Sequence, residues 1–69
     1  MKAVVIVRET KYTVETWYDR HTRSWVTQVK DSEGNQLGPA DYSGTKMGAI
    51  LYHNDAIQRV KNNHPSINE

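Results

Sequence analysis

Apolar residues follow a strand-like order in the first half of the chain and a helical period in the second half. The first apolar segment, residues 3–7, is a β-branched run without alternation. Such a run predicts a strand that is covered on both faces or lies in the middle of a sheet.

Two further strands are predicted where apolar and polar side chains alternate. Within residues 12–18, alternation puts four side chains on one face: Tyr12, Val14, Thr16 and Tyr18. Trp17 belongs to the opposite face of the same strand. Residues 24–30 alternate as well, and since the connection at 19–23 is short and polar, we expect the two strands to form a hairpin.

Turn residues interrupt the chain after this hairpin. Gly34 and Asn35 tolerate a positive φ, so the chain is expected to reverse around them. Residues 36–37 are candidates for a short fourth strand, which the following Gly-Pro pair would end. Residues 41–44 are predicted to be a loop that leads into a helix.

From Thr45 onward the apolar residues recur with the 3.6-residue period of an amphipathic helix. One half of this helix holds seven residues that are expected to be buried: Met47, Ala49, Ile50, His53, Ala56, Ile57 and Val60. Ser43 or Thr45 is expected to cap the first amides, and the asparagines and proline within residues 62–65 to end the helix. Gly48 costs about 1 kcal/mol relative to alanine inside a helix, which predicts a close approach to the sheet or the preceding loop.

Together these elements predict a single α+β domain over residues 1–63 and a frayed tail over residues 64–69. The expected architecture is a three-stranded or four-stranded antiparallel β-meander followed by one C-terminal amphipathic helix packed on one sheet face. Since one helix covers only one face of a sheet, the opposite face is left open to solvent or to a partner.

The composition bears on the cellular location and the charge of the protein. No cysteine occurs among the 69 residues, so disulfides and thiolate zinc sites are excluded and a reducing, cytoplasmic location is expected. The longest apolar run is far too short to cross a bilayer, so no membrane partner is expected. The formal net charge is +1, but residues 1–30 carry six bases against three acids and residues 31–69 carry three bases against five acids.

Residues suited to catalysis are scarce. His21, His53 and His64 lack the spacing of a metal site, and His53 lies on the apolar side of the helix, as a hydrogen-bonded core residue would. Asp19, His21 and Ser24 are neighbours on a tight loop, where side chains seldom converge into a nucleophilic group. Since so short a chain rarely encloses a substrate pocket, we expect no enzyme activity, metal, cofactor or small-molecule substrate.

Basic and aromatic residues gather around the predicted hairpin. The candidate partner-binding residues are Trp17, Arg20, His21, Arg23, Trp25 and Lys30. Arg8 and Lys11 are further candidates for the same side of the sheet. Because Trp, Tyr and Arg are enriched at protein hot spots, this cluster favours a protein partner or self-association. Cations beside aromatic rings also suit nucleic acid, whose phosphates they neutralise and whose bases stack.

A simpler interpretation is that both tryptophans pack against the helix while the basic residues only keep the hairpin tip soluble. The hairpin register decides between these interpretations, because it sets which face carries Trp25.

The three strands lead into a helix that opens with Ser43-Gly44-Thr45-Lys46-Met47-Gly48-Ala49. Over residues 12–60 this order resembles the C-terminal half of double-stranded RNA-binding domains, which implies RNA binding, although only Lys46 stands where that family has several lysines. In size and style the chain is also similar to small phage and mobile-element proteins that occlude a host target. We therefore expect a non-enzymatic interaction module, an inhibitor or adaptor, with nucleic-acid binding as the alternative.

Overall fold

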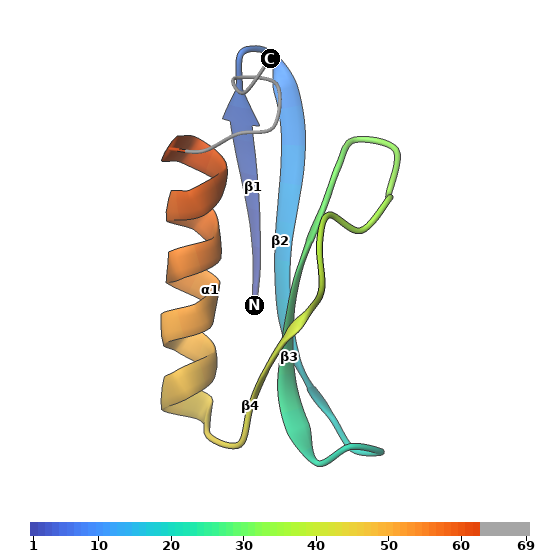
Figure 1. Ribbon diagram of the computed structural model, residues 1–69, viewed down its shortest axis with the longest axis vertical. Coiled ribbons are helices and arrows are strands. Elements are labelled where there is room, and N and C mark those ends of the chain that lie inside the picture. The colour runs from blue at the N-terminus through green and yellow to red at the C-terminus, as the bar shows by residue number, and fades with distance from the viewer. Residues whose placement is uncertain (63–69) are drawn as a thin grey trace.

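The computed structural model describes residues 1–62 as a four-stranded antiparallel sheet with one helix packed against it (Figure 1). The elements are β1 (Lys2–Val7), β2 (Thr10–Asp19), β3 (Ser24–Lys30), β4 (Asp41–Ser43) and α1 (Lys46–Asn62). The strand order is β1-β2-β3-β4, so each strand pairs with its neighbour in sequence. The predicted α+β meander is confirmed in its four-stranded form, and the expected tail over 64–69 lies outside the described residues.

The register of the strands places the core under the helix. Val14 of β2 lies opposite Ala3 of β1 and Val29 of β3, and directly opposed residues of an antiparallel pair share one face. The buried core consists of Val5, Tyr12, Val14, Ala56 and Val60, with Ala3, Val7, Val29, Leu37 and Ile57 packed around it. This face is called the covered face below, and the opposite face the open face.

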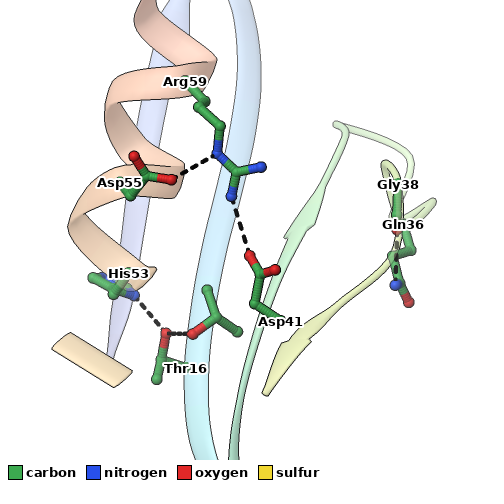
Figure 2. A network of polar contacts seen from close by, with 8 residues as sticks. Thr16, Gln36, Gly38, Asp41, His53, Asp55 and Arg59 are labelled. Carbon is green, nitrogen blue, oxygen red and sulfur yellow. Dashed lines mark hydrogen bonds and ion pairs between the residues drawn. The ribbon is translucent and has the colours of Figure 1, made fainter. Parts of the chain in front are cut away.

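A buried polar network ties α1 to the centre of the covered face. The Thr16 hydroxyl lies 2.8 Å from the Thr27 hydroxyl and 2.7 Å from Nδ1 of His53, and all three residues are buried. Figure 2 shows His53 reaching from the helix to Thr16. Burial lowers the pKa of His53, and the nearby N-terminal ammonium lowers it further, so the imidazole is neutral at pH 7. The expectation of a hydrogen-bonded core histidine is confirmed.

The start of α1 is built by two hydroxyl groups. Thr45 Oγ1 accepts a hydrogen bond from the Gly48 amide at 3.0 Å, which makes Thr45 the N-cap. Ser43 Oγ accepts from the Thr45 amide at 3.2 Å and donates to the Thr45 carbonyl at 2.9 Å. A Cβ atom on Gly48 would collide with Ser43 Oγ, so the predicted close approach at this glycine is confirmed.

An ion pair connects Arg59 in the C-terminal half of α1 to β4. Arg59 contacts Asp41 of β4 at 3.2 Å and Asp55 of its own helix at 3.1 Å, as Figure 2 shows. These ion pairs are partly exposed, so they contribute little to stability, but they fix which flank of the helix lies toward β4.

Two predictions about the fourth strand are wrong. Residues 41–43, predicted to be a loop, form β4, whereas Gln36 makes only an isolated bridge to Lys30. The Leu37 amide donates a hydrogen bond to the Val29 carbonyl, and the Leu37 side chain packs against the core. Gly38, with a φ of 73°, turns the chain at the next residue. The chain therefore leaves the sheet after residue 37 and pairs with β3 again only through β4, just before α1 begins.

The prediction of a central or doubly covered first strand is also wrong. β1 is an edge strand, and Val4 and Ile6 are 52% and 69% exposed on the open face. A one-helix domain covers only alternate residues of an edge strand, so a run without alternation leaves apolar side chains in solvent.

Two of the seven expected buried helix residues, Met47 and Ile50, are exposed. The buried line of α1 is narrow and consists of Ala49, His53, Ala56 and Val60. Met47 lies about 160° around the helix from Ala49, which directs its side chain away from the sheet.

Two tight turns place residues at positive φ, one at a glycine and the other at residues with side chains. The predicted reversal at 31–35 is confirmed: Gly34 has a φ of 86°, and Asp31 Oδ1 accepts the Asn35 and Glu33 amides, each at 2.9 Å. These hydrogen bonds, that from Asn35 foremost, lower the pKa of Asp31. The turn from β1 to β2 instead places Arg8 and Glu9 at φ of 50° and 68°, a conformation that hairpin turns usually give to Asn or Gly.

Candidate functional site on the open face of the sheet

A row of three residues crosses the open face from β2 to β4. Trp17 lies opposite Val26, and Val26 lies opposite Tyr42. Trp17 is 38% exposed and Tyr42 59% exposed, whereas Val26 between them is only 5% exposed. Since α1 lies on the other face, neighbouring side chains must shield Val26. We call Trp17, Val26 and Tyr42 the aromatic row.

Two aliphatic side chains are exposed on the same face at the β1 edge. Val4 lies opposite Thr13, and Ile6 lies opposite Lys11. Val4 and Ile6 are more exposed than Trp17. By the register, Lys2, Thr13 and Glu15 lie between these two residues and Trp17, so Val4 and Ile6 form a separate exposed apolar patch at the β1 edge.

The open face carries a small excess of positive charge. Alternation along the strands assigns three lysines and two acids to it: Lys2, Lys11, Lys30, Glu15 and Asp19. Lys30 Nζ lies 3.5 Å from the Glu15 carboxylate, and both side chains are partly exposed. The predicted site residue Lys30 therefore lies on the open face, and Glu15 balances part of its charge.

The hairpin tip adds further positive charge at one end of the sheet. Arg20, His21 and Arg23 are all exposed in the connection between β2 and β3. Asp19 Oδ1 accepts the His21 backbone amide at 2.9 Å, and Arg23 has a φ of 55°. Arg8, a further candidate from the sequence, instead lies in the β1–β2 turn at the opposite end of the sheet (Figure 1), so it does not join this cluster.

Trp25 is separated from Trp17 by the hairpin register. It lies opposite Tyr18, on the covered face, where the two rings form an edge-to-face pair with centroids 5.5 Å apart. The pairing of Asp19 with Ser24 sets this register, and because side chains alternate, it sends the two tryptophans to opposite faces. Trp17 therefore lies on the open face, whereas the predicted site residue Trp25 lies on the covered face beside Tyr18.

Sequence reasoning missed Tyr42, Val26, Val4 and Ile6 as members of this surface. Tyr42 gave no signal, because a three-residue strand has too few positions to show alternation. Val4 and Ile6 were hidden in a run that predicted a covered strand. Only the pairing of β4 with β3 and the edge position of β1 reveal them.

The polar loop residues do not converge into a catalytic arrangement. Asp19 Oδ1 binds the backbone of His21, and Ser24 Oγ donates to the Thr22 carbonyl, so neither side chain contacts the imidazole of His21. Within residues 1–62 no group of three or more His, Asp or Glu side chains is placed to hold a metal ion.

The fold and surface define a class: a small four-stranded antiparallel sheet with one covering helix and an open face that exposes aromatic side chains. Comparison with models of known families, with curated proteins and with solved structures finds no match to this chain. None of the helices in the described part of the chain is long and apolar enough to cross a membrane.

Proposed function

We propose that this protein is a non-enzymatic interaction module that binds a protein partner through the open face and the basic hairpin tip. The observation that supports this most directly is the aromatic row, in which two exposed rings flank a shielded valine on an uncovered sheet face. A ring anchored beside a small apolar residue loses little conformational freedom on binding, and Trp and Tyr are the residues on which interface energy concentrates.

The arginines of the hairpin tip would form the polar rim of this interface. Arg20 and Arg23 are exposed at the end of the sheet that carries Trp17, and guanidinium groups bind carboxylates with two parallel hydrogen bonds. The partner surface should therefore combine an apolar patch with acidic residues at one side. Such a module would act in the cytoplasm as an inhibitor or adaptor that covers a site on its target, in the manner of small phage proteins.

The experiment is capture of partners from the native host's lysate by the immobilised protein, with and without nuclease. Trp17→Ala and Tyr42→Ala should each lose the captured protein, whereas Tyr18→Ala should retain it. Tyr18 is the matched control because it is 47% exposed and adjacent to Trp17, but on the covered face. Equal capture by all three variants would overturn the proposal, provided that their thermal midpoints stay near that of the wild type.

Nucleic-acid binding is the second candidate, and the lysines of the open face favour it. Lys2, Lys11 and Lys30 lie on the face that exposes the Trp17 ring, an arrangement that suits phosphate contacts and base stacking. A phosphate-binding protein should lose affinity steeply between about 50 and about 200 mM salt. No binding to single-stranded or double-stranded probes at low salt would remove this candidate.

A further inference from the structure

The outer edge of β1 carries backbone groups that no strand of the sheet uses. Met1 and Thr16 exchange both backbone hydrogen bonds, at 2.7 and 2.8 Å. Bonded and non-bonded pairs alternate along an antiparallel ladder, so Ala3 and Val5 bond inward to β2. The amides and carbonyls of Lys2, Val4 and Ile6 therefore point outward.

This edge has few of the features that usually protect an edge strand, and the only charged side chain in β1 is Lys2 at its first residue. β1 has six residues, contains no proline, and has no charged side chain on its covered face. The other edge of the sheet, β4, has only three residues. Among residues 1–62 no other segment pairs with the outer side of β1.

The helix exposes apolar residues on the flank that lies toward this edge. The Arg59 side chain contacts Asp41 of β4. Ile50 precedes Arg59 by nine residues, or about two and a half turns, so the two side chains lie on opposite sides of the helix axis. Ile50, which is 39% exposed, therefore lies on the β1 side of α1, and the half-buried Ile57 lies two turns further along on the same side. Both layers of the domain thus present unpartnered apolar groups at one edge.

We infer that β1 pairs antiparallel with β1 of a second copy of this chain. With a two-fold axis at Val4, Val4 lies opposite Val4 of the second copy and Lys2 lies opposite Ile6 of the second copy. The outward groups then match, because the same even-numbered residues carry them in both copies, and about six new hydrogen bonds form. Opposed residues share a face, so the two covered faces join and both helices lie on the same side of an eight-stranded sheet.

A second copy fits this edge better than an extended peptide does. A stable interface takes about 800 Å² from each partner, which is about one sixth of the 4893 Å² surface of this chain. An edge of six residues is only about 20 Å long, so a single strand laid on it falls short of that area and leaves the flank of Ile50 exposed. A second copy brings its own helix to the same side and its own isologous edge.

The dimer would carry two aromatic rows on one continuous open face. If the proposed function holds, the protein would then bind a repeated or dimeric partner with enhanced avidity. The dimer itself does not depend on that function, because the aromatic row takes no part in the contact.

The test is the molar mass in solution over a wide concentration range, measured by sedimentation equilibrium, together with amide hydrogen exchange. The amides of Lys2, Val4 and Ile6 should be protected at high concentration and exchange fast on dilution, whereas those of Ala3 and Val5 should be protected throughout. Val4→Pro, which removes only an outward amide, should raise the dissociation constant about tenfold or more. Val4→Thr, which keeps the amide, is the matched control.

A monomer at every concentration would overturn the inference, as would a dimer in which the outward amides exchange fast. Hydrogen exchange of the wild type keeps the test decisive if Val4→Pro fails to fold. The two proposals fail separately: a monomer that still captures a partner through Trp17 refutes only the dimer, and a dimer that captures nothing refutes only the proposed function.

Discussion

Removing one hydroxyl from the buried network should be among the most damaging conservative substitutions in this protein. Thr16→Val preserves the shape of the side chain and its preference for strands. It also removes the single oxygen that contacts both Thr27 and His53. Two buried polar atoms, Thr27 Oγ1 and His53 Nδ1, would lose the partner they have in the folded protein.

The magnitude follows from the number of groups left without a partner. A buried polar group without a hydrogen bond costs about 1–3 kcal/mol, so two such groups should lower the free energy of unfolding by about 2–4 kcal/mol after partial relaxation. The whole domain is expected to have about 3–10 kcal/mol of stability, at about 0.05–0.15 kcal/mol per residue. The substitution therefore removes a large fraction of the total.

Two matched variants separate the network from the general effect of replacing threonine by valine. Thr27→Val leaves the bond between Thr16 and His53 in place, so it should cost about 1 kcal/mol. Thr13→Val lies on the open face outside the network and should change stability by less than about 0.5 kcal/mol. The free energies come from urea denaturation followed by tryptophan fluorescence and far-UV circular dichroism. The reasoning is refuted if Thr16→Val costs no more than Thr27→Val.

Three further predictions concern the helix, the core histidine and the first turn. Gly48→Ala should lower stability by about 1 kcal/mol in spite of its better helix propensity, because the new Cβ meets Ser43 Oγ. The loss should shrink in a Ser43→Ala background, and additive costs in denaturant titrations would contradict the collision. Burial holds the pKa of His53 below its ordinary value of 6.5, so the unfolded chain takes up a proton first and stability should fall as the pH drops through 6.5. His53→Leu should flatten this slope in urea titrations at several pH values, and a wild-type stability that is constant from about pH 7.5 to about pH 5.5 would show the idea to be wrong. Glu9→Gly should raise the thermal midpoint, with a gain of about 1 kcal/mol, since it relieves a φ of 68°; an unchanged or lower midpoint would mean that the turn is not strained.

The candidate site was only partly predictable. Trp17 was assigned to the face opposite Tyr12 and Val14 from alternation alone, and the register agrees. The exposed hairpin tip also followed from the polar connection at 19–23. The position of Trp25 did not follow, because the number of unpaired residues in the hairpin sets it, and a shift of one residue would reverse its face.

Local periodicity determined most of the elements by itself. Residues 24–30 and the helix from 46 to 62 were recognised because strand and helix periods are properties of contiguous sequence. The helix cap and the close approach at Gly48 were equally local, since both depend on residues within one turn of each other.

Which apolar residues are covered depends on contacts between distant parts of the chain. Val4, Ile6, Tyr42 and Ile50 are exposed because β1 is an edge, β4 pairs with β3, and one narrow helix lies on one face. Strand order and register arise from contacts between segments distant in the chain, and no local pattern encodes them. Local patterns therefore suffice to predict a helix-covered sheet with an uncovered face, whereas contacts between distant segments set which side chains that face and the β1 edge present.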